Sequence, residues 1–192
     1  MNYTGIRSKY SFLWAIFSFG ITVIRLFMAI YCFFFLLYDG VTSVYFLISI
    51  IVAIIFMDQV DGKIFEKTFL NSYETWRDYR RVFDSVCDRI CIQLFCVPLL
   101  VLQSDFIVIY FAILLKELLT SINCIKAYRS NIILASNTAG KISSIAIGLC
   151  VITWLLHFYF LSYCIVPIIL VTGSISYIRY RSSYRKYFNG ID

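Results

Sequence analysis

Four carboxylates on two otherwise apolar stretches are the residues of this chain best suited to chemistry. Asp58 and Asp61 lie three positions apart in MDQVDGKIF, and Asp84 and Asp88 lie four apart in RVFDSVCDRI. On helices, these spacings place each pair on one face, a single turn apart. Charged groups at membrane depth are costly unless they face a partner, a cavity or a metal. Carboxylate oxygens suit Mg²⁺ and Mn²⁺, so the sequence predicts that the four acids hold one of these cations.

The composition is that of an integral membrane protein. The 192 residues are 61% hydrophobic, whereas a soluble domain is about 45–50% apolar. The lysines and arginines behind the net charge of +6 lie at the ends of apolar runs, so membrane orientation explains them and no nucleic-acid partner is expected. Seven cysteines are scattered singly without a CxxC motif. This pattern favours free thiols over a disulfide framework or a zinc site.

Six apolar runs approach the ~20 residues that a membrane helix needs. The sequence therefore predicts an all-α integral membrane bundle of six transmembrane helices, forming one domain over residues 1–192. The expected helices cover residues 12–38, 44–62, 83–102, 106–125, 141–157 and 160–179. The second run reaches the required length only if it includes the turn that carries Asp58 and Asp61. We therefore expect the acids at the facing ends of the second and third helices.

The basic residues indicate how this bundle is oriented. With six spans, both termini and the intervals after the second and fourth helices lie on one side of the membrane. All seventeen Lys and Arg residues fall in those segments or at the helix ends that face them. The opposite loops contain Asp39, Asp105 and His157, without a lysine or arginine. The positive-inside rule thus predicts that the termini and the acids face the cytoplasm, in a multi-pass protein of the plasma (inner) membrane.

Acids ringed by cations at a membrane face suggest a diphosphate substrate whose lipid part stays in the bilayer. A metal would neutralise the diphosphate and its leaving group, and one acid could deprotonate an attacking hydroxyl. Gly62, directly after Asp61, would let the backbone approach a nucleotide closely. The alternative is a simple ion-pair cluster, in which the acids pair with four arginines: Arg77, Arg80, Arg81 and Arg89.

Basic residues near the same helix ends form a second candidate set. They could converge on the phosphate of a small polar acceptor; the candidates are Arg25, Lys116, Arg129 and Lys141. Lys141 opens a helix and Arg25 lies within an apolar run, which favours a functional role for both. The alternative is anchoring to anionic lipid headgroups, and Lys116 could pair with the adjacent Glu117.

The acids resemble the signature of the CDP-alcohol phosphatidyltransferases, which reads DxxDGxxAR, a spacer, then GxxxDxxxD. Asp58-x2-Asp61-Gly62 matches the first half, and Asp84-x3-Asp88 matches the acids of the second. Further motifs resemble the phosphatidylglycerophosphate synthase branch of that family: Thr22-x2-Arg25, Lys116-Glu117 and Gly140-Lys141-Ile142.

The resemblance implies a six-helix fold, usually homodimeric, with a metal-containing polar cavity facing the cytoplasm. It implies that an alcohol attacks the β-phosphate of a CDP-linked lipid and that CMP leaves. Asp58, Asp61 and Asp84 would be the principal metal ligands, and Asp88 would be the base as well as a further ligand. The best single candidate for the reaction is CDP-diacylglycerol plus glycerol 3-phosphate, giving phosphatidylglycerophosphate.

Three positions depart from the family pattern. The Ala-Arg of the family falls at Phe65-Glu66, and its glycine before the second acid pair falls at Arg80. Lys67, Arg77 or Arg80 could replace the missing arginine. We expect Gly62, Lys67 and Arg80 to contact the nucleotide. Two alternatives stay open: the same fold with a different CDP-alcohol donor or acceptor in a specialised pathway, and a non-catalytic divalent-cation-binding membrane protein.

Overall fold

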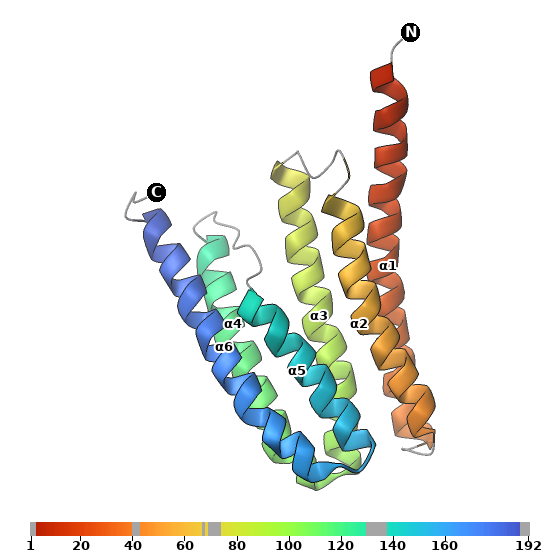
Figure 1. The fold of residues 1–192 in the computed structure, drawn as a ribbon, viewed down its shortest axis with the longest axis vertical. Helices are drawn as coiled ribbons and strands as arrows, with labels where there is room; N and C mark the ends of the chain where they lie inside the picture. Colours follow the sequence, from red (N-terminus) through yellow and green to blue (C-terminus); the bar gives the residue numbers. More distant parts are fainter. Residues whose placement is uncertain (1–2, 40–42, 67, 69–73, 130–137, 189–192) are drawn as a thin grey trace. The chain divides into compact units, whose positions relative to one another are not determined.

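A computed structural model describes residues 3–39, 43–66, 68, 74–129 and 138–188 of the chain, and these residues are almost entirely helical (Figure 1). In chain order, the elements are α1 (Tyr3–Asp39), α2 (Val44–Glu66), α3 (Glu74–Leu102), the short 3-10 helix η2 (Ser104–Phe106), α4 (Ile107–Arg129), α5 (Thr138–Leu155) and α6 (Tyr159–Phe188). The predicted all-α class is confirmed.

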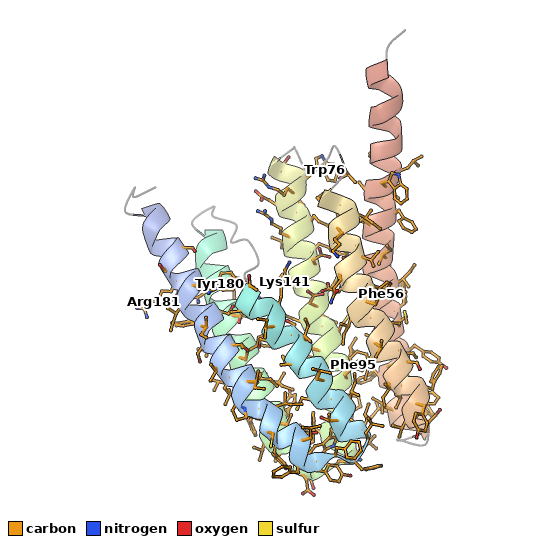
Figure 2. The ribbon with its side chains drawn as sticks, in the orientation of Figure 1. Phe56, Trp76, Phe95, Lys141, Tyr180 and Arg181 are labelled. Atoms are coloured by element: carbon orange, nitrogen blue, oxygen red, sulfur yellow. The ribbon has the colours of Figure 1, made fainter. Side chains whose placement is uncertain are left out.

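Within the described part of the chain, five helices are long and apolar enough to cross a membrane. These spans are Phe12–Tyr38, Val44–Phe65, Thr75–Leu102, Thr138–Leu155 and Tyr159–Ser183. The sixth long helix, α4, carries Lys116 and Glu117 inside its apolar run. Outward-facing side chains such as Phe56, which is labelled in Figure 2, are exposed, as expected for surfaces that meet lipid. The chain therefore has the architecture of a multi-pass helical membrane protein.

Helices α1, α3 and α6 extend beyond the apolar runs that mark them in the sequence. The clearest case is α3, which begins at Glu74 and carries a polar stretch before its apolar part. Charged pairs one turn apart stabilise that stretch of helix. Arg81 Nη1 lies 3.7 Å from Asp78 Oδ1, and Arg80 Nε lies 3.1 Å from Asp84 Oδ2. The extension matters for the site, because it holds Arg80 on a regular helix one turn before Asp84.

The chain divides into two compact units, residues 1–95 and 96–192. Unit 1 contains α1, α2 and α3 up to Phe95. The buried positions of α1 recur every three or four residues, so they form a single face: Ala15, Ser18, Thr22, Arg25, Ala29, Cys32 and Leu36. Small and polar side chains on such a face let neighbouring membrane helices approach closely. On this face, Ser18, Thr22 and Arg25 place two hydroxyl groups and one guanidinium in the interior of unit 1.

Unit 2 contains the end of α3, η2 and helices α4 to α6. Trp154 is buried near the end of α5, with its ring centroid 5.2 Å from that of Phe106 and 4.6 Å from that of Tyr159. His157 makes the turn between α5 and α6 with a positive φ of 63°, and its Nδ1 lies 2.6 Å from the Tyr159 hydroxyl. His157 therefore has a structural role in the turn between α5 and α6.

Helices α4 and α6 pack closely where Gly173 meets Lys116. A Cβ atom added to Gly173 would lie 2.6 Å from Lys116 Cγ and 3.3 Å from Lys116 Cβ. Neither atom is the mobile end of the lysine, so one helix would have to shift. A glycine is thus required at this contact.

The Gly173→Ala variant is expected to lower the free energy of unfolding by about 1–3 kcal/mol, the usual cost of overpacking. Thermal unfolding of the purified protein in detergent would measure the effect. Gly20→Ala is the matched control, because a Cβ atom on Gly20 meets nothing within 4 Å and alanine favours a helix. Equal stability of the two variants would contradict the close contact.

Candidate active site

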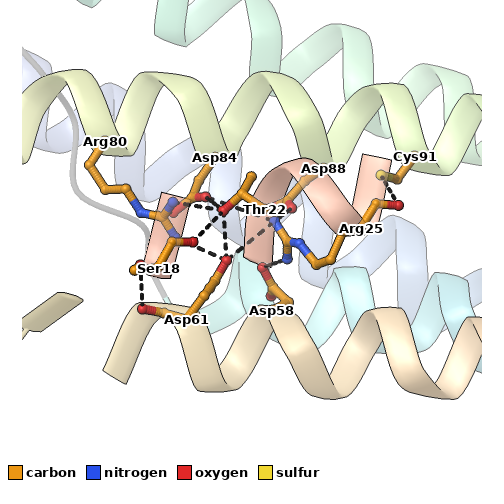
Figure 3. Close-up of polar contacts among 9 residues, drawn as sticks. All are labelled: Ser18, Thr22, Arg25, Asp58, Asp61, Arg80, Asp84, Asp88 and Cys91. Carbon is orange, nitrogen blue, oxygen red and sulfur yellow. Dashed lines mark hydrogen bonds and ion pairs between the residues drawn. The ribbon is translucent and has the colours of Figure 1, made fainter. Parts of the chain in front are cut away.

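The four carboxylates predicted from the sequence lie together inside unit 1 (Figure 3). Two come from α2 and two from α3, and the buried face of α1 completes the group. We use the name acid cluster for Asp58, Asp61, Asp84 and Asp88. Each pair lies on one face of its helix, and the two pairs come together around Arg25 of α1.

Arg25 of α1 is the centre of the acid cluster. Its Nη1 donates a hydrogen bond to Asp58 Oδ1, and its Nη2 donates to Asp88 Oδ1 at 3.0 Å. The same Nη2 lies 3.8 Å from Asp84 Oδ1 and 3.9 Å from Asp61 Oδ2. The side chain is only 1% exposed. One buried guanidinium thus contacts all four carboxylates.

Arg80 of α3 is a second buried cation in the acid cluster. Its Nη2 lies 2.9 Å from Asp61 Oδ2, and its Nε lies 3.1 Å from Asp84 Oδ2. These two contacts are ion pairs without the angles of hydrogen bonds. Its Nη1 donates a hydrogen bond of 2.7 Å to Thr22 Oγ1. Arg80 therefore joins α3 to both α2 and α1.

Hydroxyl groups of α1 fix the buried end of the acid cluster. The Thr22 hydroxyl lies 2.8 Å from Asp61 Oδ2 and 3.1 Å from Asp84 Oδ1, so it can donate its proton to either carboxylate. One turn earlier, Ser18 Oγ donates to the backbone carbonyl of Asp61 at 3.0 Å. The sequence motif pointed to Thr22 without a role. The spacing of Ser18, Thr22 and Arg25 in an otherwise apolar run is the signal that could have found the whole polar face.

Exposure divides the acid cluster into two ends. The Asp58 and Asp88 side chains are 48% and 44% exposed, whereas those of Asp84 and Asp61 are 26% and 1% exposed. Arg25 lies closest to the exposed pair, and Arg80 contacts only the less exposed pair. A ligand can therefore reach Asp58 and Asp88 more readily than the other two.

The acid cluster suits a divalent cation in donor type and in charge. Its oxygens are hard ligands of the kind that Mg²⁺ and Mn²⁺ prefer. Four carboxylates gathered around Arg25 and Arg80 also provide negative charge that attracts such an ion. The guanidinium groups of Arg25 and Arg80 already occupy positions where these carboxylates attract positive charge. As placed, no three Asp, Glu, His or Cys side chains among the described residues surround one point as metal ligands do.

The residues predicted to contact a nucleotide have different surroundings. Gly62 lies on α2 beside open space, since an added Cβ atom meets nothing within 4 Å. Arg80 is engaged with the acid cluster, as described above. Glu66 ends α2, and Lys67 lies outside the described residues. The space beside Gly62 is therefore the described feature that best suits close approach of a nucleotide.

The predicted acceptor-binding residues other than Arg25 belong to unit 2. Lys116 is buried in α4, with its Nζ 2.6 Å from Glu117 Oε1, so the pairing considered as an alternative is present. Lys141 is exposed in the first turn of α5 (Figure 2). Arg129 is the last residue of α4. Of the two lysines, Lys141 is the one that the structure leaves open to a ligand.

Comparison with known proteins gives one match. The family model named CDP-alcohol phosphatidyltransferase covers residues 17–175, which include the whole acid cluster and both arginines. No curated protein and no solved structure matches the chain. Members of this family transfer substituted phosphate groups from CDP-alcohols and generally depend on a divalent metal.

Proposed function

Because the chain belongs to the CDP-alcohol phosphatidyltransferase family, we propose that it transfers the phosphatidyl group of CDP-diacylglycerol to glycerol 3-phosphate. The products would be phosphatidylglycerophosphate and CMP. The observation that carries this proposal is the convergence of four carboxylates from α2 and α3 on one partly exposed cluster inside a membrane protein. The motifs around Thr22, Lys116 and Gly140 favour the phosphatidylglycerophosphate synthase branch.

The acid cluster is the proposed holder of Mg²⁺ or Mn²⁺. Its four carboxylates provide the hard oxygen ligands and the negative charge that attract such an ion. When bound, the ion would supply Lewis-acid neutralisation of the donor diphosphate and of the departing CMP. When no substrate is bound, Arg25 and Arg80 hold the four carboxylates together, because each guanidinium bridges α2 and α3.

Asp88 is the proposed general base. A base must reach the proton that it removes, which favours the exposed carboxylates of Asp58 and Asp88 over buried Asp61. The family signature assigns this role to the last acid, which is Asp88. Its carboxylate would accept the proton of the acceptor hydroxyl while that oxygen attacks the β-phosphorus. The bond between the β-phosphorus and the oxygen bridging to CMP then breaks, and CMP carries away the electron pair.

Substrate contacts can be assigned by exposure. The open space beside Gly62 suits the nucleotide of the donor, since no side chain blocks the backbone there. Lys141, exposed at the start of α5, suits the acceptor phosphate, because its charge adds to the positive end of the helix dipole. The basic residues at the termini support a cytoplasmic location of the site in the plasma (inner) membrane. A homodimer follows from the family resemblance.

A second candidate keeps the chemistry and changes the substrate. Phe65 and Arg80 stand where the family has alanine and glycine, and both are buried beside the acid cluster. Two large side chains in place of small ones alter the volume available near Asp61. This observation favours a different CDP-alcohol or a different acceptor as the alternative.

Release of CMP by the purified, full-length protein tests both candidates. We expect CMP from CDP-diacylglycerol only when glycerol 3-phosphate and Mg²⁺ or Mn²⁺ are present, and none after chelation with EDTA. Serine, glycerol and an inositol phosphate serve as competing acceptors, and CDP-ethanolamine as a competing donor. Turnover with one of these instead supports the second candidate. Absence of CMP from every pair, in a folded protein that binds metal, contradicts a transferase.

A further inference from the structure

The carboxylate partners of Arg80 do not by themselves fix the orientation of its guanidinium. Its Nη2 lies 2.9 Å from Asp61 Oδ2 and its Nε lies 3.1 Å from Asp84 Oδ2, but neither contact has the angles of a hydrogen bond. Attraction between opposite charges depends on distance and leaves a planar group free to turn. The hydrogen bond from Nη1 to Thr22 Oγ1, at 2.7 Å, still permits rotation about its own axis. A further constraint therefore has to set the plane of the guanidinium.

Two aromatic rings provide this constraint. The Arg80 Cζ lies 5.1 Å from the ring centroid of Phe19 on α1 and 5.7 Å from that of Phe65 on α2. A guanidinium is attracted to the face of a ring at this range and, because it is planar, can stack on it. The two rings meet edge to face, with their centroids 6.1 Å apart, so they form a corner. The corner and the hydrogen bond to α1 together restrict the guanidinium to one orientation.

The two rings are held in place independently of the carboxylates. Phe65 is 4% exposed near the end of α2, where the backbone N–H and the hydroxyl of buried Thr68 both donate to its carbonyl, at 2.9 and 2.7 Å. Phe19 also contacts the ring of Phe83 on α3, with the centroids 5.8 Å apart. Rings from all three helices of unit 1 therefore meet beside Arg80.

Phe65 and Arg80 are two of the positions at which the chain departs from the family pattern. They stand where that pattern has alanine and glycine, and they contact each other in the structure. An alanine would provide no ring for Arg80, and a glycine would provide no guanidinium for Phe65. Each departure thus has a structural reason only in the presence of the other, which indicates a joint role.

We propose that Phe65, together with Phe19, is a positioning residue for the reaction: its ring orients the Arg80 guanidinium, which holds the carboxylates of Asp61 and Asp84 in place. This inference rests on the proposed function, in which those carboxylates belong to the reacting site. The ring acts through Arg80. Its removal keeps the charge but loosens the orientation, so it should slow the chemical step more than it weakens substrate binding.

A double-mutant cycle of Phe65→Leu and Arg80→Gln tests the contact without any substrate. Leucine keeps an apolar side chain but has no ring. We expect the two changes to be coupled by about 5- to 30-fold in the unfolding equilibrium constant, the range of a buried cation–π contact. SDS titration of the full-length protein in detergent measures this constant. Phe95→Leu is the matched control, because Phe95 is also buried in unit 1 but lies about 22 Å further along α3. Its coupling to Arg80→Gln should stay below about twofold.

Steady-state CMP release tests the positioning role, with kcat calculated per folded chain. We expect Phe65→Leu to lower kcat by about tenfold or more while the KM values of donor and acceptor stay within about twofold. Phe65→Tyr keeps the ring and should retain most of the wild-type kcat. Phe95→Leu should leave kcat unchanged. A purely structural role of the ring would lower the yield of folded protein and leave kcat per folded chain as it is.

Three results overturn the inference. They are a coupling below twofold between Phe65→Leu and Arg80→Gln, a kcat of Phe65→Leu equal to that of Phe95→Leu, and a Phe65→Tyr variant as slow as Phe65→Leu. If Arg80→Gln does not fold, the kcat values of the other three variants still decide.

The two measurements also separate failure of this inference from failure of the proposed function. Coupling without CMP release from any substrate pair leaves the contact between ring and guanidinium in place and refutes the transferase. CMP release by the wild type, with no coupling and no loss of kcat in Phe65→Leu, overturns the positioning role and leaves the transferase standing.

Discussion

Asp88→Asn is expected to reduce CMP release by about 10²- to 10⁴-fold, the range that a positioned general base contributes. In the wild type, Arg25 donates a hydrogen bond of 3.0 Å to Asp88 Oδ1. Asparagine has the same size, and its side-chain oxygen can still accept that hydrogen bond. The amide cannot accept the proton of the acceptor hydroxyl. Arg25 keeps its contacts with the other three carboxylates, so the variant should insert and fold.

Asp78→Asn is the control for this prediction. Asp78 also lies on α3, is partly buried and pairs with Arg81, 3.7 Å away and outside the acid cluster. Its loss should leave the rate of CMP release within about twofold of the wild type, since surface substitutions of this kind have small effects. Steady-state CMP release, normalised to folded protein in detergent, compares the variants. Unchanged turnover in both Asp88→Asn and Asp84→Asn would rule out the acid cluster as the reaction site.

The positions of the acids could be predicted because they depend on local geometry. Residues three or four apart on a helix share a face, and costly charges in apolar runs must meet a partner. Asp58 and Asp61 were therefore expected to face a charged partner, a cavity or a metal, and so were Asp84 and Asp88. Helix type followed from the length of the apolar runs in the same way. Hydropathy marks only the membrane part of a helix, however, which is why the polar start of α3 at Glu74 was not expected.

The partners of the acids could not be predicted to the same degree. Arg80 and Arg81 are neighbours in the sequence, yet about 100° of helical rotation sends one into the acid cluster and the other to Asp78. Spacing alone left the metal site and the ion-pair cluster as alternatives. In the structure, the carboxylates that pair with Arg25 and Arg80 also supply oxygens of the kind that bind divalent cations. The two interpretations are therefore compatible, because arginines can gather carboxylates that also attract a metal.

Long-range contacts explain the other gaps. Nothing near Gly173 in the sequence indicates that it faces Lys116, because the contact depends on how α4 and α6 pack in unit 2. The stacking of Arg80 on Phe65 likewise depends on tertiary packing. In the sequence, these two positions are separate departures from a family pattern. Together in the structure, they indicate a local change that preserves the four acids and adds a fixed positive charge beside them.

Arg25→Leu is expected to lower the free energy of unfolding in EDTA by about 3–5 kcal/mol, the cost of removing one partner from a buried ion pair. The variant removes the guanidinium that contacts all four carboxylates, so repulsion between the α2 and α3 acids increases. Arg25→Lys keeps the charge and should lose less. Ile24→Ala is the control on the same helix, because Ile24 is exposed on the outer face of α1.

Mg²⁺ makes the Arg25→Leu experiment a test of cation binding as well as of stability. The midpoint of thermal unfolding should rise more in Arg25→Leu than in the wild type when Mg²⁺ replaces EDTA, because the ion supplies the charge that the variant lacks and stabilises the state that binds it. A variant as stable as Ile24→Ala in EDTA would contradict the central role of Arg25. A low midpoint that Mg²⁺ does not raise would keep Arg25 as a structural centre and argue against metal binding by the acid cluster.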